Sequence, residues 1–274
     1  MHRVAAALAL AVISAAALPA IAGETRCWVD NGAVVVPALL GDIAGDFILD
    51  LSAPHSQLHL TTAQSHGLDD AAETEGPLIL ASERIPARLA IADLDDRGWG
   101  FATNIDGVLG ADVLAGYVVD LGFAPCRLTL RRRAPAATVL SSLPLTTIAG
   151  IPTVSASIFD GRKMRTGHLA IDTGAAGLRL SSDVARFSRL SARVDPLSRD
   201  RPPARLAALS MGGAVLPNQR AALEIGAPDG VLGGVGTDVW SRYVLRLDRR
   251  RGRLSLIAPP AAVSARRRAR SGGS

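Results

Sequence analysis

The stretch that decides the fold is Gly116–Leu130, which reads Gly-Tyr-Val-Val-Asp-Leu-Gly-Phe-Ala-Pro-Cys-Arg-Leu-Thr-Leu. Its pattern returns at Arg242–Leu256, which reads Arg-Tyr-Val-Leu-Arg-Leu-Asp-Arg-Arg-Arg-Gly-Arg-Leu-Ser-Leu. Tyr117 then aligns with Tyr243, and the apolar residues keep the same spacing in both copies. Self-similarity within one chain indicates a duplicated architecture before any single motif is interpreted. We therefore expect two copies of one structural unit.

Two further blocks upstream support this internal repeat. Asp106–Gly110 reads Asp-Gly-Val-Leu-Gly, and the same residues recur at Asp229–Gly233. Phe47–Asp50 reads Phe-Ile-Leu-Asp and aligns with Leu169–Asp172, which reads Leu-Ala-Ile-Asp. All the blocks recur in the same order at nearly the same separations, so chance repetition is an inadequate explanation.

The repeat divides the chain into lobe 1, residues 23–138, and lobe 2, residues 139–260. A polar stretch with a proline, residues 131–137, is typical of a linker between them. Leucines alternate at Leu128/Leu130, the period-two pattern of half-buried strands, and neither lobe shows a long helical period. Many short strands with Gly and Pro turns predict an all-β protein with two barrel-like or sandwich-like lobes.

The N-terminal residues have the order of a secretory signal peptide. Arg3 is followed by an apolar run and then by Ala20-Ile-Ala22, which predicts a signal peptide over residues 1–22 that is cleaved before Gly23. An uncleaved membrane anchor is the alternative. The mature chain is therefore expected to be periplasmic or secreted, with no membrane attachment after cleavage.

Charge and cysteine content limit the classes of partner and the cellular compartment that we expect. The 30 Lys and Arg residues exceed the 25 Asp and Glu residues, and part of the excess lies in a basic tail, residues 261–274, for which solvated disorder is favoured over a nucleic-acid or membrane anchor. Aromatic residues make up only 4% of the chain, so base stacking is disfavoured and no nucleic-acid partner is expected. After export, Cys27 and Cys126 are expected to form a disulfide, with two free thiols as the alternative.

The segment Ala170-Ile-Asp-Thr-Gly-Ala175 resembles the aspartic proteases of the pepsin and retropepsin type. In that family an apolar strand delivers Asp-Thr-Gly, and a later strand that ends in two apolar residues and a glycine threads beneath it as a ψ-shaped loop. The later strand would be Val108–Gly110 in lobe 1 and Val231–Gly233 in lobe 2. The resemblance thus covers nearly the whole mature chain.

The resemblance implies a bilobal fold in which Asp50 and Asp172 meet between the lobes as a catalytic pair. Such carboxylates share one proton, so that the ionised acid activates a water while the protonated acid polarises the peptide carbonyl. Thr173 and Gly174 would shape the loop around Asp172. The implied function is an exported aspartic endopeptidase that cleaves peptides or unfolded proteins. A monomer suffices because one chain supplies both acids, and the chemistry calls for no cofactor and no metal.

Lobe 1 departs from the family pattern directly after its aspartate. Asp50 is followed by Leu51-Ser52, where the family has Thr-Gly. The family threonine bonds the opposite loop, and Leu51 cannot make that bond. Ser52 adds a side chain where glycine allows close approach. The alternative function is therefore a catalytically impaired homologue that binds peptides or proteins, and a purely structural duplicated β protein is a further alternative.

A substrate flap is expected from a lobe 1 hairpin whose turn carries Ser82 and Glu83. Trp99 follows in a more polar segment and is a further flap candidate, with ordinary packing as its alternative. His55 and His59 are four residues apart, but the strand pattern around them and the lack of further ligands disfavour zinc.

Overall fold

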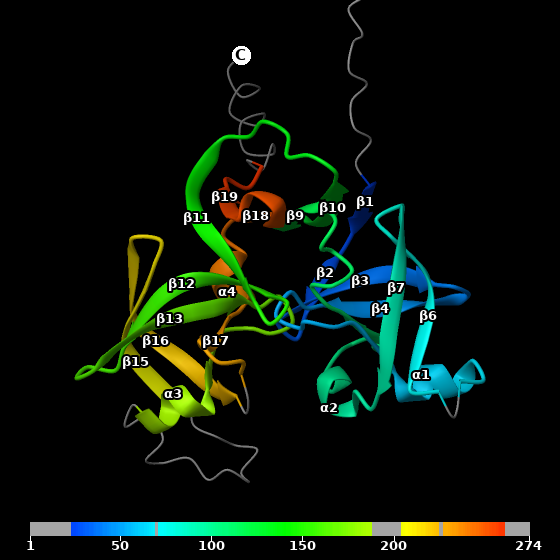
Figure 1. Ribbon diagram of the computed structural model, residues 1–274, viewed down its shortest axis with the longest axis horizontal. Helices are drawn as coiled ribbons and strands as arrows, with labels where there is room; N and C mark the ends of the chain where they lie inside the picture. Colours follow the sequence, from blue (N-terminus) through cyan, green and yellow to red (C-terminus); the bar gives the residue numbers. More distant parts are fainter. Residues whose placement is uncertain (1–22, 69–70, 188–203, 225–226, 261–274) are drawn as a thin grey trace, which may run out of the picture.

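The computed structural model describes residues 23–68, 71–187, 204–224 and 227–260. The predicted signal peptide and the predicted basic tail lie outside these described residues. The strands form two closed barrels that are joined through a shared sheet (Figure 1). The expected all-β, two-lobed fold class is therefore confirmed.

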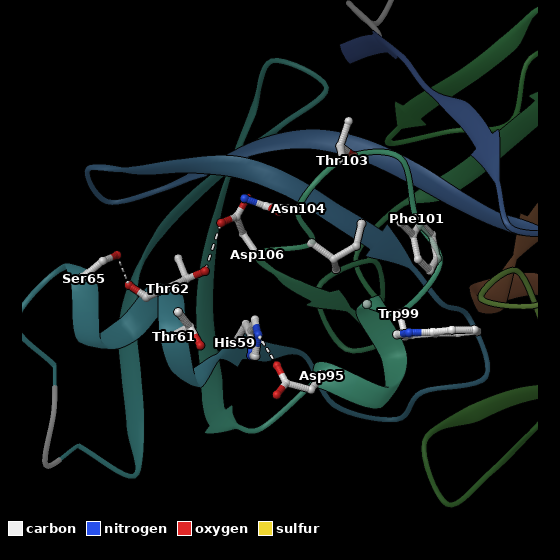
Figure 2. A pocket seen from close by; sticks show the side chains of 12 residues that line it. His59, Thr61, Thr62, Ser65, Asp95, Trp99, Phe101, Thr103, Asn104 and Asp106 are labelled. Atoms are coloured by element: carbon white, nitrogen blue, oxygen red, sulfur yellow. Dashed lines mark hydrogen bonds and ion pairs between the residues drawn. The ribbon is translucent and has the colours of Figure 1, made fainter. Parts of the chain in front are cut away.

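The barrel of lobe 1 closes because its strands pair in the order β3-β4-β8-β5-β7-β6 and β6 pairs back with β3. Its walls are strongly apolar, and the Ala-Val-Val-Val sequence that opens β3 is wholly buried. Two short helices at one end of this barrel carry side chains that face a common space (Figure 2). The elements of this lobe are β2 (Trp28–Asp30), β3 (Ala33–Leu40), β4 (Ile43–Leu49), β5 (Gln57–His59), α1 (Leu60–Ser65), β6 (Glu73–Leu80), β7 (Glu83–Ala92), α2 (Asp95–Gly98) and β8 (Gly107–Leu109).

The barrel of lobe 2 has the same sequence of pairings, β12-β13-β17-β14-β16-β15, and β15 pairs back with β12. Strands β4 and β8 run parallel in lobe 1, and β13 and β17 run parallel in lobe 2. Within the described ranges, no helix has the length and apolar character needed to cross a membrane. The elements of this lobe are β12 (Ile151–Phe159), β13 (Met164–Ile171), β14 (Leu178–Ser181), α3 (Ser182–Phe187), β15 (Ala204–Met211), β16 (Ala214–Glu224), β17 (Val231–Val235) and α4 (Thr237–Trp240).

A third sheet unites the lobes in the order β1-β10-β9-β18-β19-β11. At its centre β9 pairs antiparallel with β18, and Asp120 lies opposite Arg246. Arg246 donates to both carboxylate oxygens of Asp120, at 2.6 and 2.8 Å, and both residues are buried. The expected disulfide joins Cys27 to Cys126 at one side of this sheet. Its elements are β1 (Gly23–Arg26), β9 (Val118–Phe123), β10 (Cys126–Arg131), β11 (Val139–Ile148), β18 (Val244–Asp248), the 3-10 turn η2 (Arg249–Arg251) and β19 (Arg253–Ile257).

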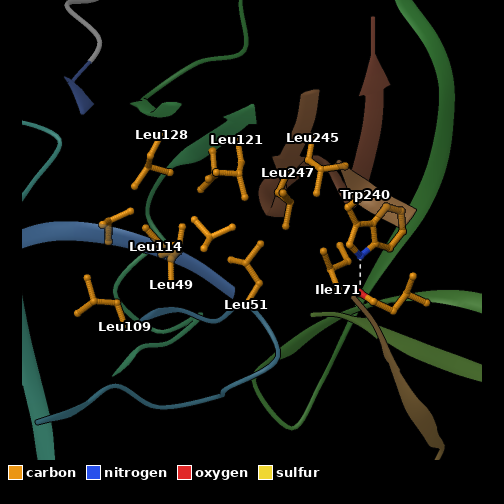
Figure 3. Close-up of a cluster of buried hydrophobic side chains, with 14 of the residues drawn as sticks. Leu49, Leu51, Leu109, Leu114, Leu121, Leu128, Ile171, Trp240, Leu245 and Leu247 are labelled. Carbon is orange, nitrogen blue, oxygen red and sulfur yellow. Dashed lines mark hydrogen bonds between the residues drawn. The ribbon is translucent and has the colours of Figure 1, made fainter. Parts of the chain in front are cut away.

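The main hydrophobic core continues from the shared sheet into both barrels. Figure 3 shows Leu51 among Leu49 of its own lobe and Ile171 and Leu247 of the other lobe, all members of one buried cluster. Only 2% of the Leu51 surface is exposed. Leu51, which directly follows Asp50, is therefore held by apolar packing between the lobes.

The ψ-strand of lobe 2 has a different register from the one that the repeat predicts. In lobe 1, β8 places Leu109 beside Leu49. In lobe 2, the matching position beside Ile171 is taken by Val235 rather than by Leu232. Val231–Gly233 does lie in β17, parallel to β13, as expected, but the repeated Asp-Gly-Val-Leu-Gly block is offset by three residues. His168 already pairs with Val231, and a register shift between His168 and Leu169 adds the last residue of the offset.

Candidate functional site

Asp50 and Asp172 occupy the same position in the two lobes. Each follows a barrel strand, and each donates its backbone N–H across the parallel pairing, Asp50 to the carbonyl of Leu109 and Asp172 to the carbonyl of Val235, both at 2.9 Å. Their exposed fractions are 1% and 0%. A buried carboxylate needs charged or hydrogen-bonding partners to offset its lost hydration. The neighbours of each acid therefore decide what the pair can do.

Ser52 and Gly174 stand at matching places around the two carboxylates. The N–H of Ser52 donates to Oδ1 of Asp50 at 2.8 Å, and the N–H of Gly174 donates to Oδ1 of Asp172 at 3.0 Å. A Cβ atom at Gly174 would lie only 2.6 Å from Cγ of Asp50, so glycine is what lets lobe 2 approach the lobe 1 acid. Ser52 instead adds a hydroxyl, which donates to Oδ1 of Asp50 at 2.6 Å.

Thr173 ties the two loops together from one side only. Its Oγ1 accepts a hydrogen bond from the N–H of Leu51 at 3.0 Å and donates one to the carbonyl of Leu49 at 2.6 Å. All of these groups are buried. Leu51 has no hydroxyl to form the reverse contact, so the hydroxyl bonds between the two loops come from Thr173 alone among the described residues of these loops.

Asp50 has a cationic partner that the sequence did not reveal. Nη2 of Arg97 donates to Oδ2 of Asp50 at 2.7 Å. Arg97 lies on α2, within the segment 93–106 that connects β7 to β8, and its side chain is 35% exposed. Lobe 1 thus covers its own carboxylate with a guanidinium.

Asp172 has a matching partner in lobe 2. Nε of Arg179 donates to Oδ2 of Asp172 at 2.7 Å, and Nη2 lies 2.5 Å from the same oxygen. Arg179 stands on β14 between Leu178 and Leu180, both buried, and the alternation of the strand turns it to the opposite side. The residue at the same register in lobe 1 is Gln57, so this cation belongs to lobe 2 alone.

The surroundings of Asp50 favour its ionised form. Burial is the largest influence and raises the pKa of Asp50, but the charge of Arg97, the hydrogen bonds from Ser52 and Arg97, and the charge of Arg179 together hold that pKa below its ordinary value. A proton-sharing pair needs one acid that stays protonated. Asp172 is itself bound to a guanidinium, so the two acids do not face each other as a free pair.

The predicted flap at Ser82 and Glu83 is wrong. Glu83 accepts a hydrogen bond from the hydroxyl of Tyr117 at 3.1 Å, because the hairpin turn points toward the shared sheet (Figure 1). The segment 93–106 covers Asp50 instead. Trp99, the other flap candidate, lies in this segment, and 82% of its surface is exposed.

One group of potential metal ligands lies beside α2. Ligand atoms of His59, Asp93 and Asp95 all lie within 4.8 Å of one another, and His55 is not among them. Nδ1 of His59 accepts a hydrogen bond from the N–H of Leu94 at 3.3 Å, so the ring proton must sit on Nε2, which faces Asp95 at 3.2 Å. A protonated Nε2 has no lone pair for a metal. This group therefore does not fit a metal centre.

Arg97 and Arg179 are the site residues that the sequence analysis missed. For Arg179 a signal exists, because a residue between two buried leucines on a strand, soon after Asp172, must point to the other face. For Arg97 no local pattern helps, since it lies in an irregular polar segment 47 residues from Asp50 in the sequence.

Comparison with known proteins gives independent support for the fold class. No protein-family model and no curated protein matches this sequence. Among solved structures, the chain is similar to the crystal structure of the aspartic proteinase from Irpex lacteus, with a TM-score of 0.51 and 14% sequence identity. The alignment covers 89% of this chain and 99% of that chain. At this identity the likeness shows a pepsin-like, two-lobed fold and leaves the activity to the chemistry of the site.

Proposed function

We propose that this chain is a catalytically impaired homologue of the aspartic proteases, which binds peptide or protein segments without cutting them. The observation that carries the proposal is the arginine on each carboxylate, Arg97 on Asp50 and Arg179 on Asp172. Fold likeness supports homology of architecture only, so the function has to be argued from these contacts.

The two ion pairs oppose the chemistry of an aspartic protease. Hydrolysis needs one protonated acid to polarise the carbonyl and one ionised acid to activate water. A guanidinium stays charged at any physiological pH and favours the ionised form of a carboxylate beside it. With Arg97 on Asp50 and Arg179 on Asp172, neither acid is left to carry the shared proton.

Binding is supported by the side chains that the site leaves exposed. Trp99 is 82% exposed, which is unusual for so large an apolar residue. The side chain of Arg97 is 35% exposed, and within the described part of the chain Nη2 is its only guanidinium nitrogen with a hydrogen bond, which leaves donors for a ligand carbonyl. Tryptophan and arginine are the residues most enriched at binding hot spots. We assign the ligand contact to these two side chains.

Two assays on the mature chain test the proposal. Denatured protein should stay uncut between about pH 3 and 6, where aspartic pairs are active, while peptides from a mixed library bind saturably. Trp99→Ala should weaken binding about tenfold. Met164→Ala is the matched control, because Met164 is an exposed apolar residue of lobe 2, and it should leave binding unchanged. Cleavage that a statine-type inhibitor blocks and Asp172→Asn abolishes would overturn the proposal.

The exported endopeptidase is the second candidate, because Thr173 and Gly174 keep the placement that the chemistry requires. In this alternative, Arg97 leaves Asp50 as substrate enters, and a water is activated between Asp50 and Asp172. Acid cleavage by the wild-type chain supports this candidate. Cleavage only by Arg97→Gln/Arg179→Gln would instead identify the arginines as the cause of impairment.

We also propose that the mature chain begins at Gly23 and resides in the periplasm or outside the cell. Support comes from the order of residues 1–22 and from the disulfide between Cys27 and Cys126, a bond typical of oxidising compartments. N-terminal sequencing of the protein from the periplasmic fraction and from the medium tests this. A retained Met1 would contradict it.

A further inference from the structure

A pocket lies in lobe 1 beside α2, and its lining includes neither of the two aspartates of the candidate site. Its volume is about 660 Å³, within the range of small-ligand sites. Figure 2 shows His59 and Asp95 close together, Asp106 and Asn104 near each other, and Trp99 at the far side from Ser65. Trp99 of the proposed peptide contact lines this space, whereas Asp50 and Asp172 do not.

The charged side chains among the described residues that line the pocket are acidic. Asp95 and Asp106 both line it, and none of its lining residues within the described ranges is an arginine or a lysine. This is notable in a chain with 30 such residues and a formal net charge of +5. Asp106 is fixed by the N–H of Asp46 at 2.9 Å and the hydroxyl of Thr62 at 2.9 Å, both of which are neutral donors.

His59 positions Asp95 at the edge of this pocket. Its Nδ1 accepts from the N–H of Leu94, and its Nε2 faces Oδ1 of Asp95 at 3.2 Å. The ring thus connects the backbone at Leu94, directly before α2, to the carboxylate of Asp95.

The backbone at Trp99, which also lines the pocket, is held in place by hydrogen bonds. The carbonyl of Trp99 accepts a hydrogen bond from Nδ2 of Asn31 at 3.2 Å, and the N–H of Ala102 donates to Asp30 at 2.8 Å. Both contacts tie the segment 93–106 to the turn between β2 and β3. The indole ring, which is 82% exposed, is thus presented from an anchored position.

We propose that this pocket binds a cationic group on an aliphatic stem, namely the lysine or arginine side chain of a bound segment. Asp95 and Asp106 meet the charge, the oxygen of Asn104 accepts from its N–H groups, and the face of Trp99 covers the stem. The inference rests on the proposed peptide binding and names its preferred ligand, a basic segment. A free amine would use the same chemistry.

Titration calorimetry with Nα-acetyl-arginine amide tests the site on the mature chain. Nα-acetyl-norleucine amide serves as the uncharged probe, and spermidine represents free amines. We expect saturable binding of the arginine amide and none of the norleucine amide. Asp95→Asn, which keeps the acceptor for His59, should weaken binding about tenfold, as loss of a charge-assisted contact does. Asp42→Asn is the control, because Asp42 is an exposed acid of the same lobe outside this pocket.

The outcomes separate the pocket from the proposed function. Trp99→Leu should abolish a tryptophan emission shift that the arginine amide causes. If the amide binds while no library peptide does, the pocket stands and peptide binding fails. If peptides bind without preference for basic residues, and Asp95→Asn matches wild type, the pocket assignment is overturned.

Tighter binding of spermidine, still lost in Asp95→Asn, supports the cation site with a free amine as its ligand. Equal losses in Asp95→Asn and Asp42→Asn would reduce the effect to general surface charge and overturn it.

Discussion

The hydroxyl of Thr173 in one lobe accepts a hydrogen bond from the backbone N–H of Leu51 in the other at 3.0 Å, whereas the side chain of Leu51 contributes only apolar packing. The two loops that carry the aspartates are therefore joined by a polar contact on one side and by the hydrophobic core on the other. This asymmetry explains how the lobes stay in register although lobe 1 has no threonine after Asp50.

Thr173→Val should destabilise the fold. The change keeps the side-chain shape but leaves the N–H of Leu51 and the carbonyl of Leu49 buried without their partner, at a cost of about 2–4 kcal/mol. Urea unfolding measures this cost. Thr166→Val is the control, because Thr166 lies on an exposed part of β13 and bonds only Ser157 across the strand pair. An equal loss in both variants would contradict the special role of Thr173.

Arg97→Gln should raise the pKa of Asp50. Burial raises the pKa of the Asp50 carboxyl, and the substitution removes the charge that most strongly lowers it. In the wild type the folded pKa lies below the unfolded value, so ionisation of Asp50 stabilises the fold above about pH 4, and this contribution is lost as the pH falls through the folded pKa. In Arg97→Gln the free energy of unfolding should therefore drop near neutral pH and approach the wild-type value in acid.

Unfolding curves across pH, together with carbon NMR of the Asp50 carboxyl, check this prediction. Arg84→Gln is the matched control, since Arg84 is an exposed arginine of β7 in the same lobe. A carboxyl that titrates unchanged in Arg97→Gln would show that the ion pair does not govern the site.

Asp120→Asn should cost about 3–5 kcal/mol, because it leaves the buried guanidinium of Arg246 without its charged partner. Replacement of both residues by leucine should recover part of that loss, since the buried charge of Arg246 is removed while Arg131, whose Nε lies 3.5 Å from Asp120, loses this partner in both variants. Calorimetry of the single and double variants measures the difference. If the double variant were no more stable than the single, burial of an unpaired charge could not be the cause.

Cys27→Ser/Cys126→Ser should lower the free energy of unfolding by about 4–5 kcal/mol in the chain-entropy account of a cross-link between residues 99 apart. Denaturant unfolding of the variant, compared with the oxidised wild type, gives the value. Reduced wild type should match the variant, and a stable reduced form equal to the oxidised one would contradict the prediction.

The two-lobed architecture was predictable because the sequence contains repeated blocks. The ion pairs that determine the chemistry of the site were not predictable. Alignment around Tyr117 and Tyr243 indicates two lobes, and the strands before Asp50 and Asp172 place these acids in equivalent positions. The contact of Arg97 depends on how an irregular segment folds back over its barrel, which no periodicity encodes.

Two errors have related causes. Because Asp229–Gly233 is identical to Asp106–Gly110, the repeat predicts the same strand pairing in both lobes. The structure pairs β13 with β17 in a different register, and sequence identity does not report the register of a strand pair. The hairpin at Ser82 and Glu83 was correctly expected as a hairpin, but its direction is set by the contact with Tyr117 in the shared sheet. Long-range packing of this kind overrides local expectation.

The ladder between β9 and β18 makes the boundary between the lobes a row of backbone pairs rather than a hinge. A chain cut between β10 and β11 would yield two fragments with complementary open strand edges, each a template for the other. Such fragments should reassemble when mixed, which makes this protein a natural scaffold for split-reporter designs. Either fragment alone would be prone to pair with its own copies.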